Sequence, residues 1–237
     1  MQIVGVVSNS FVDYPKKIAM ALFTPGCNMN CYYCHNREYI GGKQIRRILY
    51  HPQTIISDLK RKESFLDGVV ISGGEPTLQP GLIQFIRDIR KETSLFVKLD
   101  TNGTRPASLK TLLDEKLVDY IAMDIKAPTE KYSSVCLCPV DISSISESIK
   151  LIMSGNMDYE FRTTFSPDLS VEDIGEIARM INGAKHFSLQ QYRKPAEYTG
   201  FYDKRLDLPA HSAEEFRVAK EYLEKCCGEV LVKGINI

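Results

Sequence analysis

The sequence has no net charge, no long apolar run and no recognisable export signal. Its 30 Lys and Arg residues balance 30 Asp and Glu residues, so no overall basic field exists to hold nucleic acid or an anionic membrane. Apolar runs such as residues 18–23 are far shorter than the roughly 20 residues that cross a bilayer. Residues 1–7 contain no Lys or Arg ahead of their short apolar stretch, unlike an export signal. We expect a cytoplasmic protein that binds neither nucleic acid nor membrane.

A disulfide framework is also not expected. The chain has seven cysteines, an odd number, and thiols stay reduced in the cytoplasm. No linker, repeat or shift in composition divides the 237 residues. We therefore expect a single domain over residues 1–237, with a core at about 16–192 and a C-terminal extension at about 193–237.

Short β-branched or apolar runs alternate with longer amphipathic stretches, which predicts parallel βα units and an α/β fold. The predicted strands cover residues 18–23, 68–72, 95–100, 118–124, 159–164 and 186–190. The predicted helices cover residues 53–62, 81–91, 106–116, 142–153 and 171–181. Residues 2–7 are expected to form a hairpin with the first strand, whereas 213–226 and 230–232 add a final helix and strand.

Polar residues gather where the predicted strands end. In strand order they are Cys27, Gly73, Gly74, Glu75, Asp100, Asp124, Lys126, Arg162, Gln190 and Gln191. A barrel of parallel strands builds its site from the loops at these ends. Six βα units predict a partial (β/α)6 barrel of the TIM type, open on one side, with short N- and C-terminal extensions.

Cys27, Cys31 and Cys34 have the spacing C-x3-C-x2-C in a polar loop. Such a loop is a poor place for core cysteines, and a zinc site needs a fourth ligand for which His35 is badly placed. The loop also matches the C-x-x-C-H pattern of haem attachment, but that pattern leaves Cys27 without a role. Soft thiolates select iron–sulfur centres. Three thiolates on a four-iron cluster leave one iron able to bind another molecule.

With Tyr33 before its last cysteine, the loop resembles the signature of the radical S-adenosylmethionine (SAM) superfamily. The resemblance implies a [4Fe–4S] cluster held by Cys27, Cys31 and Cys34, with Tyr33 beside the cofactor. It also implies that SAM binds the free iron and is cleaved reductively to a 5′-deoxyadenosyl radical. The cofactors perform that step, and the protein positions them.

Three further segments extend the resemblance. Ser72-Gly73-Gly74-Glu75-Pro76 resembles the GGEP motif of this superfamily, which implies that Gly73, Gly74 and Glu75 contact the ammonium group of SAM. A plain turn is the alternative. The segments 100–103 and 124–126 resemble the DTNG and D-x-K motifs of glycyl-radical-enzyme activases.

The activase resemblance implies roles for the charged residues at the strand ends. They would bind SAM and a monovalent cation near Asp100 and Asp124, and the residues implied are Asp100, Asn102, Asp124 and Lys126. Arg162 would pair with the carboxylate of SAM. The alternatives are an Asp124–Lys126 ion pair and an interior salt bridge from Arg162 to one of the aspartates. Where these activases have a histidine after the sixth strand, this chain has the residues 188–192. His186 comes two to five residues too early, so Gln191 is the expected substitute.

Residues 10–15, 23–28 and 34–36 resemble the anaerobic ribonucleoside-triphosphate reductase activating proteins. The resemblance implies that the chain removes the Cα hydrogen of a glycine in such a reductase, with flavodoxin or ferredoxin as the electron donor. We expect residues 11–15 and 193–209 to line the opening for that partner. The alternatives are a radical SAM enzyme of the deazapurine-synthase type and a non-catalytic iron–sulfur or zinc module.

Four cysteines lie outside this pattern. Cys136 and Cys138 form a C-x-C pair, and Cys226 and Cys227 are adjacent. A redox or metal accessory is conceivable for either pair, but incidental thiols are the favoured interpretation.

Overall fold

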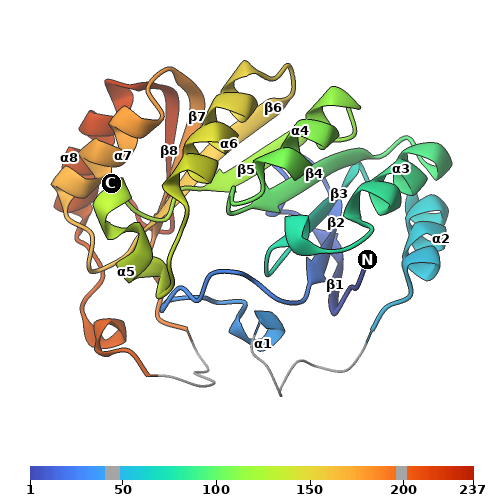
Figure 1. The fold of residues 1–237 in the computed structure, drawn as a ribbon, viewed down its shortest axis with the longest axis horizontal. Helices are drawn as coiled ribbons and strands as arrows, with labels where there is room; N and C mark the ends of the chain where they lie inside the picture. Colours follow the sequence, from blue (N-terminus) through green and yellow to red (C-terminus); the bar gives the residue numbers. More distant parts are fainter. Residues whose placement is uncertain (41–48, 196–201) are drawn as a thin grey trace.

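One eight-stranded sheet forms the centre of the protein (Figure 1). The computed structural model describes residues 1–40, 49–195 and 202–237, so residues 196–201 of the expected partner-facing segment lie outside it. The strands run in sequential order, from β1 to β8. They are β1 (Gly5–Ser10), β2 (Ala19–Thr24), β3 (Gly68–Gly73), β4 (Phe96–Thr101), β5 (Tyr120–Asp124), β6 (Asp158–Phe165), β7 (Ala184–Gln191) and β8 (Cys227–Lys233).

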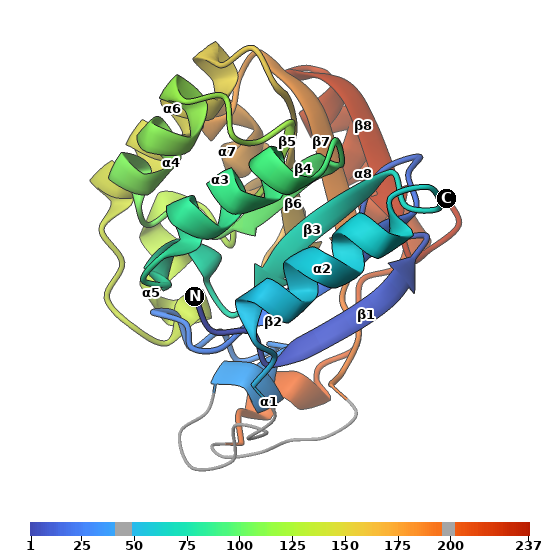
Figure 2. The ribbon, with the colours of Figure 1, turned by 90° about the vertical axis from the view of Figure 1, so that its right-hand side faces the viewer.

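The longer helices cover the outer face of the curved sheet, whereas the short helix α1 lies at the end of the barrel that carries the cysteine loop (Figure 2). The helices are α1 (Arg37–Ile40), α2 (Pro52–Lys62), α3 (Leu82–Glu92), α4 (Pro106–Asp114), α5 (Tyr132–Cys136), α6 (Ile142–Ser154), α7 (Val171–Met180) and α8 (Ala213–Glu224), with short 3-10 turns η2 (Pro76–Leu78), η3 (Thr129–Lys131) and η4 (Lys204–Asp207). Ser170 and Ser212 begin α7 and α8 with complete capping boxes, which satisfy backbone donors at the helix ends. In the described part of the chain, no helix is long and apolar enough to cross a membrane.

The predicted partial barrel is confirmed, with one extension. Strands β2 to β7 are parallel, and β1 pairs antiparallel with β2 as the hairpin prediction requires. β8 pairs parallel with β7, so the C-terminal helix and strand add a seventh parallel strand to the same sheet. The short helices α1 and α5 were not predicted, because four or five residues are too few to establish a helical period.

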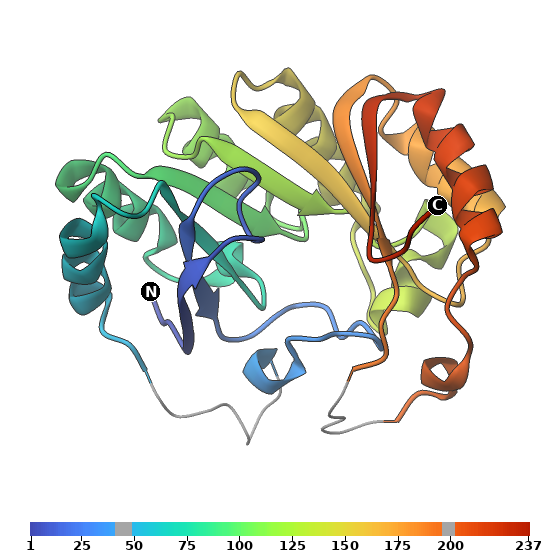
Figure 3. The ribbon, with the colours of Figure 1, turned by 180° about the vertical axis from the view of Figure 1, so that it is seen from behind.

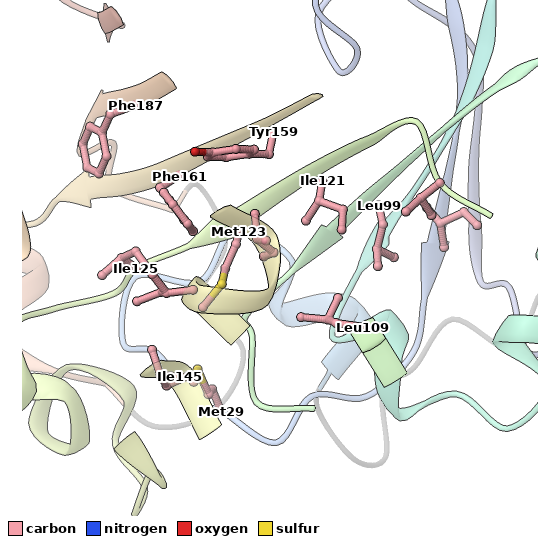
Figure 4. Packing of buried hydrophobic residues seen from close by; sticks show 14 of the residues in the cluster. Met29, Leu99, Leu109, Ile121, Met123, Ile125, Ile145, Tyr159, Phe161 and Phe187 are labelled. Carbon is pink, nitrogen blue, oxygen red and sulfur yellow. The ribbon is translucent and has the colours of Figure 1, made fainter. Parts of the chain in front are cut away.

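The two faces of the sheet differ in polarity. Outward-facing side chains such as Leu99, Ile121 and Phe161 pack against the helices to form the main core (Figure 4). Because side chains alternate along a strand, the intervening residues point into the barrel. Among them are Lys98, which is 1% exposed, and Glu160, which is 4% exposed. The barrel interior therefore contains charge, and buried charge requires partners.

The turn between β1 and β2 lies at the end of the barrel away from the predicted site. Ser10 pairs with Ala19, the first residue of β2, so residues 11–15 lie at the amino-terminal ends of the parallel strands (Figure 3). Tyr14 is buried there, and its ring lies 5.6 Å from that of Tyr120, the first residue of β5. The expectation that this turn lines the partner's opening was therefore wrong, because an antiparallel first strand carries it to the opposite end.

Candidate functional site

A cavity of about 270 Å³ lies at the carboxyl ends of the parallel strands. It is walled by the cysteine loop on one side and by the ends of β3 to β7 on the other. Most of the residues singled out in the sequence line it: Cys27, Cys31, Tyr33, Cys34, Gly73, Gly74, Asp100, Asn102, Asp124, Lys126 and Arg162. Segments up to 163 residues apart in the chain, from Cys27 to Gln190, thus meet at one site.

The cysteine loop is held in place by hydrogen bonds to its surroundings. The Asn36 Nδ2 donates to the Gly73 carbonyl over 2.8 Å, which ties the loop to the end of β3. On the other side, Asn102 Nδ2 lies 2.9 Å from Asn28 Oδ1 and 3.8 Å from Cys27 Sγ. Contacts of this kind orient ligand residues before a metal centre binds.

The three thiols of the loop differ in their surroundings. Burial raises the pKa of Cys27 to about 12, and burial also raises the pKa of Cys34. The hydrogen bond between Cys31 and Cys136 lowers the pKa of Cys31 to about 7, against the effect of burial. Metal centres bind thiolates and displace the thiol protons. Because the pKa values of Cys27 and Cys34 are raised, only a strongly binding metal centre would displace their protons.

Tyr33 carries a polar atom that nothing satisfies. Its hydroxyl is buried and has no hydrogen-bond partner among the described residues, a condition that costs about 1–3 kcal/mol. Because Tyr33 lines the cavity, a polar group bound there could satisfy the hydroxyl. Three soft thiolates beside an open polar cavity fit a [4Fe–4S] cluster that binds a polar molecule.

The two glycines at the end of β3 allow close backbone packing. Gly73 has a φ of +113°, which favours glycine. The Gly74 N–H donates to the Thr24 carbonyl over 2.9 Å, and the Glu75 N–H donates to the Gly26 carbonyl over 2.9 Å. A Cβ atom on Gly74 would overlap the Gly26 carbonyl oxygen. The glycines therefore permit contact with the start of the cysteine loop, in addition to the cofactor contact implied by the resemblance.

Gly74→Ala should displace the cysteine loop, since its Cβ meets backbone atoms that cannot move aside. We expect a loss of about 3 kcal/mol in stability and a reduced iron content after anaerobic reconstitution. Thermal unfolding and iron analysis would measure both. Gly175→Ala in α7 is the control, because its Cβ meets only the Tyr222 side chain at 3.3 Å. Full iron content and unchanged unfolding in Gly74→Ala would contradict this account of the turn.

Glu75 does not face the cavity, which differs from the expectation. Its side chain is fully buried and accepts hydrogen bonds from Thr101 Oγ1 at 2.9 Å and from the Asn102 N–H at 2.7 Å. The Thr77 N–H donates to the same carboxylate over 3.0 Å. Burial raises the pKa of Glu75, although these bonds favour the charged form. The carboxylate thus joins the ends of β3 and β4 and leaves the two glycines as the exposed part of the motif.

Five charged side chains form a network at the opposite wall. Arg162 Nε lies 2.8 Å from Asp124 Oδ1, and its NH1 lies 3.4 Å from Asp100 Oδ2. Lys126 Nζ lies 2.9 Å from Asp124 Oδ2. Lys98, which is buried inside the barrel, forms an ion pair with Asp100. The ion pairs considered as alternatives for Arg162 and Lys126 are therefore present. The four charged side chains other than Lys98 still line the cavity.

This network keeps its members charged. Burial alone would raise the pKa of Asp100 and Asp124, but Arg162 and the neighbouring lysines hold both values below the usual range. Burial would lower the pKa of Lys126, but Asp124 raises it well above the usual range. Paired charges of both signs suit a zwitterionic ligand, whose ammonium and carboxylate can exchange partners with them. A monovalent cation beside the two aspartates would have to displace one of these cationic side chains.

Known proteins match this chain over most of its length. The Radical SAM superfamily matches residues 21–181. A Methanocaldococcus jannaschii protein named as a glycyl-radical enzyme activating enzyme is 35% identical over 242 residues, which cover 98% of this chain and 95% of that protein. The chain is a radical SAM enzyme of the glycyl-radical enzyme activating family. The cofactors of this enzyme are a [4Fe–4S] cluster and SAM.

Two more comparisons bear on fold and function. The 7-carboxy-7-deazaguanine synthase of Clostridium acetobutylicum is 33% identical over 103 residues, 44% of each chain. The structure of Streptococcus suis SuiB bound to SAM matches with a TM-score of 0.64 at 15% identity, over 91% of this chain and 52% of SuiB. The radical SAM enzyme thus spans about half the length of SuiB, and this likeness shows the fold.

At the end of β7 the structure differs from the expectation for Gln191. Gln190 lines the cavity, whereas Gln191 points away and donates to the His211 carbonyl over 3.2 Å. Gln190 pairs with Thr164, which also lines the cavity, and paired residues share a face of the sheet. His186 is a strand residue whose Nδ1 lies 2.9 Å from Glu229 Oε2, so it does not substitute for the family histidine.

Other cavity residues were not predicted as site residues. They are Met29, His35, Asn36, Ile40, Ser72, Thr101, Thr164 and Gln190. His35 and Asn36 follow Cys34 directly, so their position in the loop was a usable signal. Ser72 donates to Asp100 Oδ2 over 3.0 Å, a contact between two strand ends that sequence alone cannot show.

Proposed function

We propose that this enzyme installs a radical on a glycine of a partner glycyl-radical enzyme, and that the partner is an anaerobic ribonucleoside-triphosphate reductase. The observation that carries the proposal is the match to a named activating enzyme over 98% of the chain. The deazaguanine synthase match covers only 44% of it, so a small-molecule substrate is the weaker alternative. When bound, the cluster and SAM supply a 5′-deoxyadenosyl radical that takes the glycine Cα hydrogen.

In this proposal the chain binds and orients its cofactors. Cys27, Cys31 and Cys34 hold the cluster, and the surrounding cavity residues hold SAM. The carboxylate of SAM would bind Arg162, whose guanidinium can turn from its aspartate partners toward the cavity. The residues proposed to bind SAM are Tyr33, Gly73, Gly74, Asp100, Asn102, Asp124, Lys126 and Arg162. No side-chain base is assigned, because removal of a hydrogen atom needs none.

Further parts of the proposal concern the whole protein. Residues 1–237 would form a single radical SAM domain, since one sheet contains every strand of the described chain. A flavodoxin or ferredoxin would reduce the cluster. A cytoplasmic location is part of the proposal. The zero net charge of the sequence agrees with a protein that binds neither nucleic acid nor an anionic membrane.

The C-terminal segment is the proposed contact for the partner. Its described part includes η4, where Arg205 lies 4.1 Å from the centre of the Tyr32 ring in the cysteine loop. Arg205 also pairs with Asp168 over 2.9 Å, and Tyr32 donates to Asp168 over 2.7 Å. These contacts support a position for this segment beside the cluster. Leu208 follows η4 and is 45% exposed.

Leu208→Asp should reduce formation of the glycyl radical several-fold, because it puts a charge on the proposed contact. Cleavage of SAM by dithionite-reduced enzyme should be unchanged. The matched control is Val12→Asp, since Val12 is 88% exposed at the opposite end of the barrel. Equal radical yields from both variants would argue against this contact.

The deciding experiment is an anaerobic incubation with a candidate reductase, SAM and dithionite. Electron paramagnetic resonance should show the doublet of a glycyl radical on the reductase. SAM cleavage without a radical on any glycyl-radical enzyme would favour a small-molecule substrate. Bound zinc without SAM cleavage would instead indicate a non-catalytic module.

A further inference from the structure

Cys136 lies against the cysteine loop, although the sequence pattern gave it no role. It ends α5, and its side chain is fully buried. Its Sγ lies 3.8 Å from Cys31 Sγ and 3.6 Å from Met29 Sδ. At these distances the Cys31 thiol donates to Cys136, and the Cys136 thiol donates to Met29. Cys136 therefore contacts a proposed cluster ligand directly.

The backbone fixes Cys136 in this position. The Asn30 N–H donates to the Cys136 carbonyl over 2.9 Å. Leu137 then adopts a left-handed conformation with a φ of 50°, an uncommon conformation for a branched side chain. This reversal brings Cys138 Sγ to 3.5 Å from the Asn28 carbonyl. The end of α5 therefore forms hydrogen bonds with the cysteine loop on both sides of Met29, at Asn28 and Asn30.

We propose that, once Cys31 has lost its proton to ligate the cluster, the Cys136 S–H turns from Met29 to the sulfur of Cys31. As a positioning residue, Cys136 then raises the reduction potential of the cluster through this S–H···S hydrogen bond. This inference rests on the proposed function, in which Cys31 is a cluster ligand. Hydrogen bonds to ligand sulfurs withdraw negative charge and favour the reduced cluster, and they are one of the levers that set iron–sulfur potentials. A thiol can donate such a bond while its own sulfur stays off the iron.

Geometry separates Cys136 from the other thiols outside the motif. Cys138 bonds to a carbonyl oxygen and contacts no ligand sulfur in the described part. Cys226 and Cys227 lie where α8 meets β8, away from the cavity lining. Cys136 is thus the thiol that can act on the charge of a cluster ligand, and Cys138 supplies a matched control.

The test is a redox titration of the full chain after anaerobic reconstitution, with the reduced cluster followed by electron paramagnetic resonance. Cys136→Ala should keep its iron but shift the midpoint potential to a more negative value. Cys136→Ser, whose hydroxyl can still donate, should recover part of the shift, and Cys138→Ser should leave the potential unchanged. Iron content provides the second readout.

Three results would overturn the proposed role of Cys136. An unchanged potential in iron-loaded Cys136→Ala overturns the proposal, as does an equal shift in Cys138→Ser. Loss of iron from both Cys136 variants overturns it too, because Cys136 would then be a ligand or a structural requirement. Retention of the full cluster by Cys34→Ala would instead refute the ligand set of the proposed function, so the two failures are distinguishable.

Discussion

Cys34→Ala is expected to leave the reconstituted enzyme without a stable cluster and to abolish SAM cleavage. Three thiolates are the minimum for a four-iron cluster with one open iron, and Cys34 has no substitute in the cavity lining. Iron should fall from about four per chain to near zero. The broad visible absorbance of the cluster should disappear with it, and 5′-deoxyadenosine should stay at background.

The matched control is Cys226→Ala, which removes a partly exposed thiol away from the cavity. It should retain iron, absorbance and SAM cleavage. Cys31 is a less decisive choice, because the Cys136 sulfur 3.8 Å away could capture iron in its place. A full iron complement in Cys34→Ala, together with active SAM cleavage, would refute the assignment of the three-cysteine loop.

The order of strands and helices was predictable because each element has a local pattern of apolar and polar residues. Alternating apolar runs and amphipathic stretches carry the βα pattern, and the strand ends carry the polar residues. The carboxyl ends of parallel strands lie on one side of a barrel. This rule predicts that four residues lie close together: Cys27, Asp100, Asp124 and Arg162. The structure confirms that these four residues share a cavity.

What sequence could not supply was the direction of individual side chains and the path of the first turn. A one-residue ambiguity at the end of β7 exchanged Gln190 for Gln191, because successive strand residues face opposite sides. Glu75 belongs to a motif that resembles a cofactor contact, but its bonds to the next strand end depend on tertiary packing. The contact between Cys136 and Cys31 joins residues 105 positions apart, and no local pattern indicates it.

Asp124→Asn should destabilise the enzyme and weaken SAM binding, because it leaves two cationic side chains short of a partner. Arg162 and Lys126 each lose an ion pair below 3 Å, and Arg162 keeps only Asp100 at 3.4 Å. The side chains of this group are 15–27% exposed, so we expect a loss of about 2 kcal/mol, less than for a fully buried pair. Thermal unfolding and equilibrium SAM binding would measure the two effects.

The pH dependence follows from the depressed pKa of Asp124. Its stabilising contribution is present in full above the ordinary pKa of about 4 and is lost as the pH falls further, toward the lower value of the folded state. The stability difference between wild type and Asp124→Asn should therefore be constant from pH 7 to about pH 5 and should narrow at lower pH. Asp114→Asn is the control, since its pair with Lys110 is about 60% exposed and should contribute below 1 kcal/mol.

A second substitution tests the cause of the effect. If Asp124→Asn destabilises by leaving uncompensated positive charge, then adding Lys126→Gln removes one of the unpaired cations and should recover part of the lost stability. If Lys126 contributes mainly through packing of its aliphatic stem, the double variant should be less stable than Asp124→Asn alone. Recovery of stability without recovery of SAM affinity would fit the proposed role of Lys126 in the cavity, where the network supplies both cofactor contacts and balanced charge.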